Sequence, residues 1–494
     1  MTSASEQVMT FPVVSPITGS VVGVHEDQGQ AQVRAAVARA REAAAWWASL
    51  SWTERARRLA MWKSSIVAGL DDLAELVRAE TGKPVDDARL EAMLGIEHLS
   101  WAPRNARRVL GPRRVRPGLA TANLAARVEY LPVGVVGVIG PVNYPVFTPL
   151  GSISYALAAG NAVVFKPSEQ TPATGRWLVE SFQRAVPEHP VLELVTGGGR
   201  AGRELCRAGL DKIAFTGSGA TGRRVMAACA ENLTPVVLEC GGKDALIVTA
   251  SADLRAAAEA AVWAGMVNAG QSCVGVERVY AVGEIYPEFL AQVAAVAREL
   301  RTGPGPDAHY GPVMTARQLD VITAHIQDAL HRGGRAVVGG IYAVRPPYVD
   351  PVVLTGVPED SVAMTEETFG PVVIVNRVQD VEEAIRLTNG SRLGLGSAVF
   401  CADRALSLRI ARQLRTGATS INSVVTFAGV PALPFGGTGE SGFGRVHGAD
   451  GLREFSRAKA VTRQRFRPPI NLASFRRSPA DMRRAQRLIR FLHG

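Results

Sequence analysis

A cysteine and a glutamate stand out among the residues of this chain that could do chemistry. Cys273 lies in the small-residue segment 268–278, and Glu239 precedes a glycine pair 34 residues earlier in the chain. A thiolate is a strong nucleophile, and a carboxylate nearby can serve as a general base. Taken alone, each residue could have a purely structural role, since most cysteines are small buried hydrophobes and most glutamates are solvated. The surrounding motifs therefore decide between the readings.

An asparagine upstream of this pair could support the same chemistry. Asn143 lies in the segment 141–145, Pro-Val-Asn-Tyr-Pro, directly after a predicted buried strand. An amide N–H in that place can point at a developing oxyanion. The alternative is an ordinary Asx turn, which the same composition also favours.

Two further segments have the composition of nucleotide-binding loops. Lys166 and Glu169, in Lys-Pro-Ser-Glu, follow a predicted strand at the edge where α/β folds place ligands, so they could hold ribose hydroxyls. The segment from Gly217 through Ser218 to Gly222 matches G-x-G-x-x-G between a strand and a helix, which would aim helix N–H groups at a phosphate. The alternatives are a solvated loop pair and a plain glycine turn.

These residues need strands and helices to position them, and the pattern predicts an α/β fold with parallel sheets. Residues 31–110 are predicted as helices, with a capping box at Ser51–Glu54. Beyond them, apolar strands alternate with helical stretches in two successive units. The predicted strands are 126–131, 133–140, 162–166, 212–216, 234–239, 245–248, 278–282, 336–338, 371–375 and 396–400.

Composition limits the class of protein. The chain has 494 residues, 47% hydrophobic and 20% charged, which suits a soluble protein of two or three domains. No apolar stretch reaches the roughly 18 residues of a membrane span, and Met1–Gln7 shows no secretory signal. The five cysteines have neither a disulfide framework nor metal-ligand spacing, so we expect no metal and a reducing cytoplasm.

The basic charge is concentrated at the C-terminus. Of the net +10, residues 467–494 contribute +6, from seven arginines and one acid, so we expect no nucleic-acid binding by the rest of the chain. Ser478–Asp481 predicts the start of a basic amphipathic helix. Such a helix could lie on an anionic membrane, pack on a partner subunit, or end as a solvated tail.

The ordered motifs together resemble the NAD(P)-dependent aldehyde dehydrogenase superfamily over residues 10 to 465. In chain order they are P-x-N-Y-P, K-P-S-E, F-T-G-S-x-x-x-G, E-x-G-G-K, G-Q-x-C, E-x-F-G-P and P-F-G-G-x-x-x-S-G. The segment 216–222, together with Val276-Glu-Arg, also resembles a branch with bacterial succinate-semialdehyde dehydrogenases.

The resemblance implies a role for each motif residue. Cys273 would attack the aldehyde, Asn143 and the Cys273 backbone N–H would stabilise the oxyanion, and Glu239 would activate the water that hydrolyses the thioester. The cofactor would be NAD, with NADP as an alternative. The residues that would bind it are Lys166, Glu169, Gly217, Ser218, Gly222, Glu367 and Phe369.

Several positions depart from the family pattern. Val142 stands where tryptophan is usual, and Cys240 adds a thiol beside the base, close enough to suggest a disulfide or sulfenyl adduct with Cys273. Ser152 and Val446 replace the lysine and glutamate of a proton relay found in many hydrolytic members. Gly151 replaces a bulky aromatic residue, which predicts a wider substrate tunnel.

The resemblance further implies domains, assembly and activity. We expect a Rossmann-type dinucleotide-binding domain at 1–113 and 133–240, a catalytic domain at 241–456, a bridging and oligomerisation element at 114–132 and 457–470, and a basic extension at 471–494. A homodimer or homotetramer would oxidise succinate semialdehyde, or a broad range of aliphatic and aromatic aldehydes. The alternatives are a CoA-acylating enzyme, against which Glu239 argues, and a non-catalytic structural protein.

Overall fold

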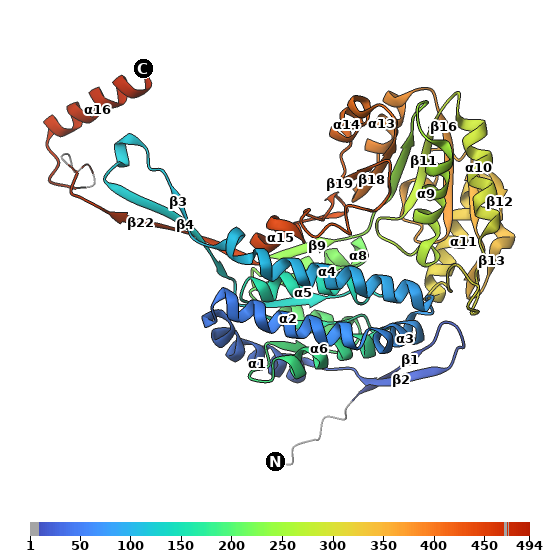
Figure 1. Cartoon of the computed structure of the whole chain (residues 1–494), viewed down its shortest axis with the longest axis horizontal. Helices are drawn as coiled ribbons and strands as arrows, with labels where there is room; N and C mark the ends of the chain where they lie inside the picture. Colours follow the sequence, from blue (N-terminus) through green and yellow to red (C-terminus); the bar gives the residue numbers. More distant parts are fainter. Residues whose placement is uncertain (1–8, 469–471, 473) are drawn as a thin grey trace, which may run out of the picture.

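The computed structural model describes residues 9–468, 472 and 474–494. It shows two α/β units side by side and an arm that projects from the first of them (Figure 1). The segment Met1–Gln7, in which we predicted no secretory signal, lies outside the described residues. In the part of the chain that the structure describes, no helix is long and apolar enough to span a membrane.

The first unit surrounds a six-stranded sheet in the order β21-β9-β8-β5-β6-β7. Its central strands are buried on both faces, which accounts for their unbroken runs of Val, Ile and Phe. The strands are β5 (Val135–Ile139), β6 (Ala162–Lys166), β7 (Leu192–Leu194), β8 (Lys212–Thr216), β9 (Val236–Glu239) and β21 (Gly442–Phe443). The helices are α1 (Gln30–Ser49), α2 (Trp52–Ala68), α3 (Leu70–Thr81), α4 (Val85–Leu110), α5 (Phe147–Ala158), α6 (Pro172–Ala185), α7 (Gly199–Arg207) and α8 (Gly219–Ala230).

The second unit surrounds a seven-stranded sheet in the order β12-β15-β16-β11-β10-β18-β19. All of its pairings are parallel except that of β12 with β15. The strands are β10 (Asp244–Val248), β11 (Val276–Val282), β12 (Arg335–Val338), β15 (Val352–Thr355), β16 (Val372–Val378), β18 (Gly396–Phe400) and β19 (Ala418–Ile421). The helices are α9 (Leu254–Met266), α10 (Tyr286–Glu299), α11 (Ala316–His331), α12 (Val362–Thr365), α13 (Val381–Asn389) and α14 (Arg404–Gln413).

The arm consists of residues 113–132 and 456–494. Its three-stranded sheet has the order β22-β4-β3, and β22 pairs with β4 in continuous antiparallel register from Ser456↔Pro132 to Gln464↔Leu124. The sheet leaves the first unit and carries a helix beyond its far end (Figure 1). The elements are β3 (Arg113–Val115), β4 (Leu124–Pro132), β22 (Ser456–Gln464) and α16 (Pro479–His493), with α15 (Gly448–Glu454) at the root.

Three short antiparallel pairs and three 3-10 turns complete the described chain. The pairs are β1 (Thr10–Val14) with β2 (Val21–Glu26), β13 (Val344–Arg345) with β14 (Tyr348–Val349), and β17 (Leu393–Gly394) with β20 (Thr438–Gly439). The turns are η1 (Leu119–Thr121), η2 (Val267–Gly270) and η3 (Ile341–Ala343).

The predicted fold class is confirmed, and so are most of its elements. Predicted strands 162–166, 212–216 and 396–400 coincide with β6, β8 and β18. The capping box at Ser51 and the helix start at Ser478 both form. β7, β15 and β19 were not predicted. Chain position 240, the predicted domain limit, falls between the two sheets, but β21 returns to the first sheet beside β9. The exact domain limits stay a prediction.

Candidate active site

The structure brings Cys273 and Glu239 into direct contact. Glu239 is the last residue of β9, and Cys273 lies in the loop between η2 and β11. The Cys273 thiol donates a hydrogen bond to Glu239 Oε1 at 3.3 Å, and the Thr216 hydroxyl donates to Oε2 at 3.3 Å. Cys273 is partly exposed, whereas the other four cysteines are buried. One thiol of five is therefore both reachable and placed against a carboxylate.

Burial gives both groups unusual proton affinities. Loss of water raises the pKa of Glu239 to about 7, although the hydrogen bonds from Cys273 and Thr216 oppose the rise. Burial, and then the negative charge of Glu239, also raise the pKa of Cys273 well above its usual value. The resting pair is thus a neutral thiol beside a group that can bind a proton near neutral pH. Glu239 is positioned to take the thiol proton when Cys273 attacks.

The loop that carries Cys273 has a strained backbone. Asn268 and Ala269 have φ of 56° and 57°, and Gly270 follows at 70°. A Cβ on Gly270 would lie 2.0 Å from the carbonyl oxygen of Gly370, so this close approach requires glycine. A left-handed non-glycine residue costs about 1–3 kcal/mol and persists where the surroundings fix it, commonly at functional sites.

Asn143 lies beside the same loop. Its side chain is buried, and Nδ2 donates to the carbonyl oxygen of Gln271 at 3.0 Å. The Asn268 amide in turn donates to the carbonyl oxygen of Asn143 at 3.1 Å and to that of Gln271 at 3.2 Å. These bonds fix the Asn143 amide next to the Cys273 loop. An amide has two N–H donors, so a second remains for a substrate oxygen.

A buried ion pair that we did not predict supports the Asn143 loop. The Lys83 ammonium contacts Glu91 and donates to the carbonyl oxygen of Asn143 at 2.8 Å. The other Glu91 oxygen accepts from the backbone N–H groups of Val146 at 2.7 Å and Phe147 at 3.1 Å. Both charged side chains are almost fully buried. Lysine and glutamate normally indicate solvated surface, so nothing in the sequence distinguished this pair.

Replacing Lys83 by methionine is expected to destabilise the protein by about 3–5 kcal/mol, because Glu91 would be left as an uncompensated buried charge. The loop carrying Asn143 would lose one of its anchors at the same time. Denaturant unfolding at neutral pH measures the change.

The matched control for this prediction is Arg255→Gln, which breaks the exposed Arg255–Glu259 ion pair of helix α9. Exposed pairs contribute about 0–1 kcal/mol, so this variant should unfold almost like the parent protein. Equal destabilisation by the two substitutions would contradict the anchoring role of Lys83.

The residues predicted to bind a dinucleotide occur at the carboxyl edge of the first sheet. Lys166 ends β6, and its buried ammonium donates to the carbonyl oxygen of Pro167 at 2.9 Å. Burial lowers the pKa of Lys166, an effect opposed by the charge of Glu169, which is exposed three residues after the strand end. Ser218 is exposed and caps helix α8 by accepting from the Thr221 N–H at 3.3 Å. Its position leaves helix N–H groups facing solvent.

Gly217 and Gly222 of this turn allow neighbouring side chains to pack closely against the backbone. A Cβ on Gly217 would lie 2.7 Å from the Phe215 ring, and one on Gly222 would lie 2.6 Å from Cys240 Sγ. The Cys240 thiol therefore points toward helix α8. Both Cys240 and Cys273 are free thiols, so the disulfide suggested by the position of Cys240 next to the base is absent. Burial also raises the pKa of Cys240 to about 11, which keeps it an unreactive thiol.

Glu367 and Phe369 lie in the loop that meets the Cys273 loop at Gly370. The Glu367 carboxylate is partly buried and accepts from the Gly242 N–H at 3.2 Å, and desolvation raises its pKa well above the usual value. Phe369 has φ of 50° and is fixed by Glu277, which accepts its N–H at 2.9 Å. Glu277 also pairs with Lys243 in the interior. This second buried pair was not predicted either.

The space beside Gly151 is not empty. A Cβ there would lie 2.3 Å from His447 Nε2, so an imidazole takes the room that the missing aromatic side chain would have used. The His447 ring lies against that of His98 at a tilt of 40°, with ring centroids 3.8 Å apart, and burial lowers the pKa of His98 to about 4. The expectation of a wider tunnel at Gly151 is therefore wrong at this position: a neutral histidine pair fills it.

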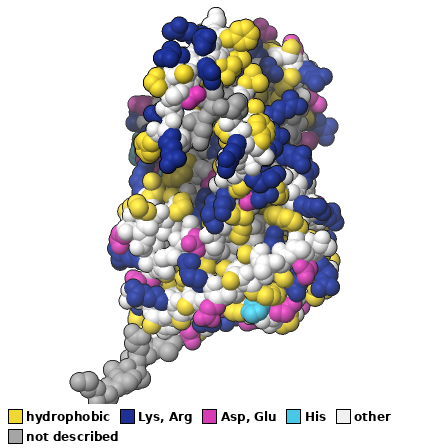
Figure 2. All heavy atoms as spheres, turned by 90° about the vertical axis from the view of Figure 1, so that its left-hand side faces the viewer, with side chains coloured by type: hydrophobic (Ala, Val, Ile, Leu, Met, Phe, Trp, Pro, Cys, Tyr) yellow, Lys and Arg dark blue, Asp and Glu magenta, His cyan; other side chains and the backbone are white. Residues whose placement is uncertain are grey.

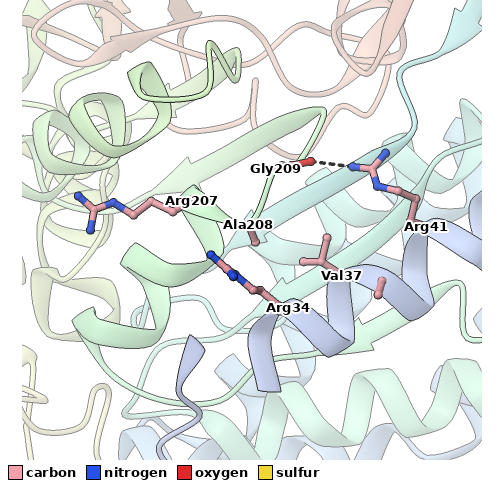
Figure 3. Close-up of a pocket in the computed structure, with 7 residues that line it drawn as sticks. Arg34, Val37, Arg41, Arg207, Ala208 and Gly209 are labelled. Carbon is pink, nitrogen blue, oxygen red and sulfur yellow. Dashed lines mark hydrogen bonds between the residues drawn. The ribbon is translucent and has the colours of Figure 1, made fainter. Parts of the chain in front are cut away.

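A separate surface hollow lies away from these residues. It has a volume of about 390 Å³ and is lined by residues of α1 and of the turn after α7, including Arg34, Arg41 and Arg207 (Figure 3). Arg41 donates to the carbonyl oxygen of Gly209 and pairs with Asp211, and Arg207 pairs with Glu231. Two of its three cations are thus already neutralised, and none of the predicted site residues lines it.

Comparison with known proteins places the chain in a family. The model of the aldehyde dehydrogenase family matches residues 2–461. A 4,4'-diapolycopene aldehyde oxidase from Methylomonas is 38% identical over 98% of this chain and 92% of its own length. A glutarate-semialdehyde dehydrogenase from Pseudomonas aeruginosa is 34% identical over 91% of this chain and 93% of its own.

Solved structures are similar to this chain in both fold and sequence. The crystal structure of an NAD-dependent aldehyde dehydrogenase from Sinorhizobium meliloti superimposes with a TM-score of 0.89 at 32% identity, covering 94% of this chain and 93% of that one. The family and fold implied by the motifs are therefore confirmed. The chain belongs to the aldehyde dehydrogenase family, as an NAD(P)-dependent oxidoreductase that acts on aldehydes.

Proposed function

We propose that this enzyme oxidises an aldehyde to a carboxylic acid through a covalent thioester on Cys273. The observation that carries the proposal is the 3.3 Å hydrogen bond from the Cys273 thiol to Glu239. It joins a reachable sulfur to a base whose pKa of about 7 suits proton transfer near neutrality. A CoA-acylating enzyme needs no such base, and a structural protein needs neither group.

The roles of the side chains follow from their positions. Glu239 accepts the thiol proton as sulfur attacks the carbonyl carbon, and the oxygen of the resulting hemithioacetal receives N–H groups from Asn143 and the Cys273 backbone. Bound nicotinamide dinucleotide supplies the hydride acceptor, which leaves a thioester on Cys273. Glu239 first releases the thiol proton to solvent. It then removes a proton from water as the water attacks the thioester, and it returns this proton to the departing sulfur, which frees the acid and restores the thiol.

The residues at the carboxyl edge of the first sheet, together with Glu367 and Phe369 of the second unit, fit the dinucleotide. Buried Lys166 has only a backbone carbonyl oxygen as its hydrogen-bond partner, and partly buried Glu367 has only one backbone N–H. Ribose hydroxyls would satisfy both groups, since each hydroxyl donates and accepts. The N-terminus of α8 at Ser218 would hold the pyrophosphate. Gly217 and Gly222 would support that turn, and Phe369 would lie at the nicotinamide side.

We expect kcat/KM to be higher with NAD than with NADP. Glu169 can accept a hydrogen bond from a ribose 2′-hydroxyl, and its carboxylate would repel a 2′-phosphate. Lys166 offsets part of that repulsion. Steady-state kinetics with each cofactor give the ratio of kcat/KM with NAD to kcat/KM with NADP. The Glu169→Ser substitution should reduce this ratio. A higher kcat/KM with NADP in the parent enzyme would refute the preference.

The charges around Cys273 favour an uncharged substrate. The charged groups that most affect the thiol are the carboxyls of Glu239, Glu367 and Asp244, with no lysine or arginine among them. A semialdehyde would bring a further carboxylate beside these acidic groups, and none of the groups that shift the Cys273 pKa is a cation that could pair with it. The relative whose match covers nearly the whole chain is named for a long polyene aldehyde. We therefore propose apolar aldehydes as the substrate class, in preference to succinate semialdehyde.

An aldehyde panel tests the function and the substrate class together. Octanal, benzaldehyde, succinate semialdehyde and a polyene aldehyde in mild detergent are each given with NAD, and the reduced cofactor is read by absorbance. We expect the apolar aldehydes to have the higher kcat/KM. The amounts of free acid and acyl-CoA formed are then measured in assays with and without CoA. Acyl-CoA in place of free acid would establish the CoA-acylating alternative.

We further propose a homodimer or homotetramer and a cytoplasmic location. Strand β22 is a long edge of the arm sheet with most of its residues exposed, and such an edge readily adds to a partner's sheet. A thiol nucleophile and four more free cysteines suit a reducing compartment. Sedimentation analysis of the purified enzyme measures its mass in solution.

A further inference from the structure

We propose that the arm docks onto an anionic lipid bilayer, with α16 lying in the membrane surface as its anchor. This inference goes beyond the proposed oxidation, and it would place the enzyme where an apolar aldehyde is dissolved. The argument rests on the distribution of charge, on the two faces of α16, and on the exposure of apolar side chains along the arm.

The basic charge of the protein is carried by the arm. Residues 113–132 and 456–494 contain 15 lysines and arginines and two acids, a net charge of +13. The rest of the chain has 40 basic and 43 acidic residues, a net charge of −3. An anionic surface is therefore attracted to the arm and not to the rest of the chain.

Helix α16 separates its residues into two faces. It begins at a capping box formed by Ser478 and Asp481, so its first turn is fixed locally. At 3.6 residues per turn most of the apolar side chains share one face, and the arginines share the opposite one with Phe491. The apolar face has Met482, Ala485, Leu488, Ile489 and Leu492, and the basic face has Arg483, Arg484, Arg487 and Arg490.

No residue of α16 is buried in the described structure. Leu488 and Ile489 are 46% and 47% exposed, and Phe491 is 85% exposed on the basic flank. Other large apolar side chains nearby on the arm are exposed too, among them Leu119, Phe466 and Phe475. Figure 2 faces this end of the molecule and shows Lys and Arg side chains interspersed with hydrophobic ones. Such a mixture suits the boundary between lipid headgroups and acyl chains.

A bilayer fits these features better than the two other anionic or apolar partners. Nucleic acid would pair with the arginines but would leave the apolar face of α16 in water. A second copy of this chain could cover the apolar face. Outside its own arm, however, that copy has a net charge of only −3, which matches the +13 of the arm poorly. An anionic bilayer would contact both faces of α16 at once, because its headgroups would pair with the arginines and its acyl chains would cover the apolar side chains.

The extent of one match agrees with a role for the arm. The diapolycopene aldehyde oxidase matches 98% of this chain, which leaves about ten residues unmatched, so part of the 15-residue α16 lies within the match. The semialdehyde dehydrogenase of Pseudomonas aeruginosa matches 91%. The similarity to a relative named for 4,4'-diapolycopene aldehyde therefore extends into α16.

Vesicle sedimentation of the full-length enzyme tests the proposal. Vesicles of phosphatidylcholine alone are compared with vesicles that also contain phosphatidylglycerol. We expect sedimentation with the anionic vesicles only, and at least about tenfold weaker binding when salt is raised from about 0.1 M to about 0.5 M, since salt screens surface charge. Equal binding to both vesicles, or none to either, would overturn the proposal.

Substitutions separate the contributions of the two faces. Changing Arg483, Arg484, Arg487 and Arg490 to glutamine should reduce vesicle binding at least about tenfold, and Leu488→Ser with Ile489→Ser should do the same. The matched control changes four exposed arginines of the body, Arg57, Arg255, Arg317 and Arg404, to glutamine, and it should bind vesicles like the parent.

Two readouts keep docking distinct from chemistry and from assembly. All variants should oxidise a water-soluble aldehyde at the parent rate. Failure of the parent enzyme in this oxidation assay would contradict the proposed function, whereas only the vesicle assay tests membrane docking. Sedimentation analysis without lipid follows the oligomer. A changed mass in the α16 variants, together with unchanged vesicle binding, would replace the membrane by a subunit interface. Tight salt-sensitive binding of duplex DNA without vesicle binding would replace it by nucleic acid.

Discussion

Replacing Cys273 by alanine is expected to abolish aldehyde oxidation and to leave NAD binding intact. Cys273 is the one cysteine of the described chain whose thiol contacts Glu239, so no other sulfur is placed to carry the acyl group. Loss of covalent catalysis should lower kcat by more than about a hundredfold. Turnover is read as reduced cofactor, and NAD binding by calorimetry on the same preparation. Residual turnover above about one hundredth of the parent value would refute the nucleophile.

The matched control removes the neighbouring thiol. Cys240 is buried, and its sulfur packs against Gly222 of helix α8. Cys240→Ala should therefore keep most of the activity, at a cost in stability of about 1 kcal/mol for the small cavity. If both cysteine variants lost activity equally, the chemistry would depend on the local packing of β9 and not on one sulfur.

Much of the framework around these residues could be predicted from the sequence. The strands that end at Lys166, Thr216 and Glu239 have apolar runs bounded by glycine or polar residues, and such runs identify strands buried on both faces. The helix starts at Ser51 and Ser478 have local capping chemistry that needs no tertiary contact. Local patterns of this kind are visible without the fold.

The supports of the site could not be predicted, because they depend on burial. Lys83 with Glu91, and Lys243 with Glu277, are ordinary charged residues in the sequence and become buried pairs only when distant segments meet. The same holds for His447, which fills the space beside Gly151 from nearly 300 residues away. One sequence gives no signal for contacts of that range, and the strained backbone at Asn268 and Ala269 is equally hidden.

Replacing Glu239 by glutamine is expected to slow thioester hydrolysis far more than acylation. Glutamine keeps the size and a hydrogen bond to the thiol but cannot take a proton. Acylation slows less than hydrolysis, because the thiol can also lose its proton to solvent and a thiolate is a strong nucleophile, whereas water needs the base as it attacks. Removal of a general base costs about 10²–10⁴ in rate. Rapid mixing with NAD and an aldehyde should show a burst of reduced cofactor, about one per active site, followed by a slow steady rate. An acyl-enzyme trapped at that stage should be visible by mass spectrometry of the intact chain.

The dependence on pH gives an independent check on the same residue. Burial raises the pKa of Glu239 to about 7, so the carboxylate that activates water predominates above that pH and is lost below it. At pH 6, one unit lower, only about one tenth of the enzyme has the base form, and kcat limited by hydrolysis should fall in proportion. The Glu239→Gln variant lacks this group, so its slow steady rate should not show the step near pH 7. A profile with the same step in both enzymes would assign the titration to another group, and equal losses in burst and steady rates would remove Glu239 from hydrolysis.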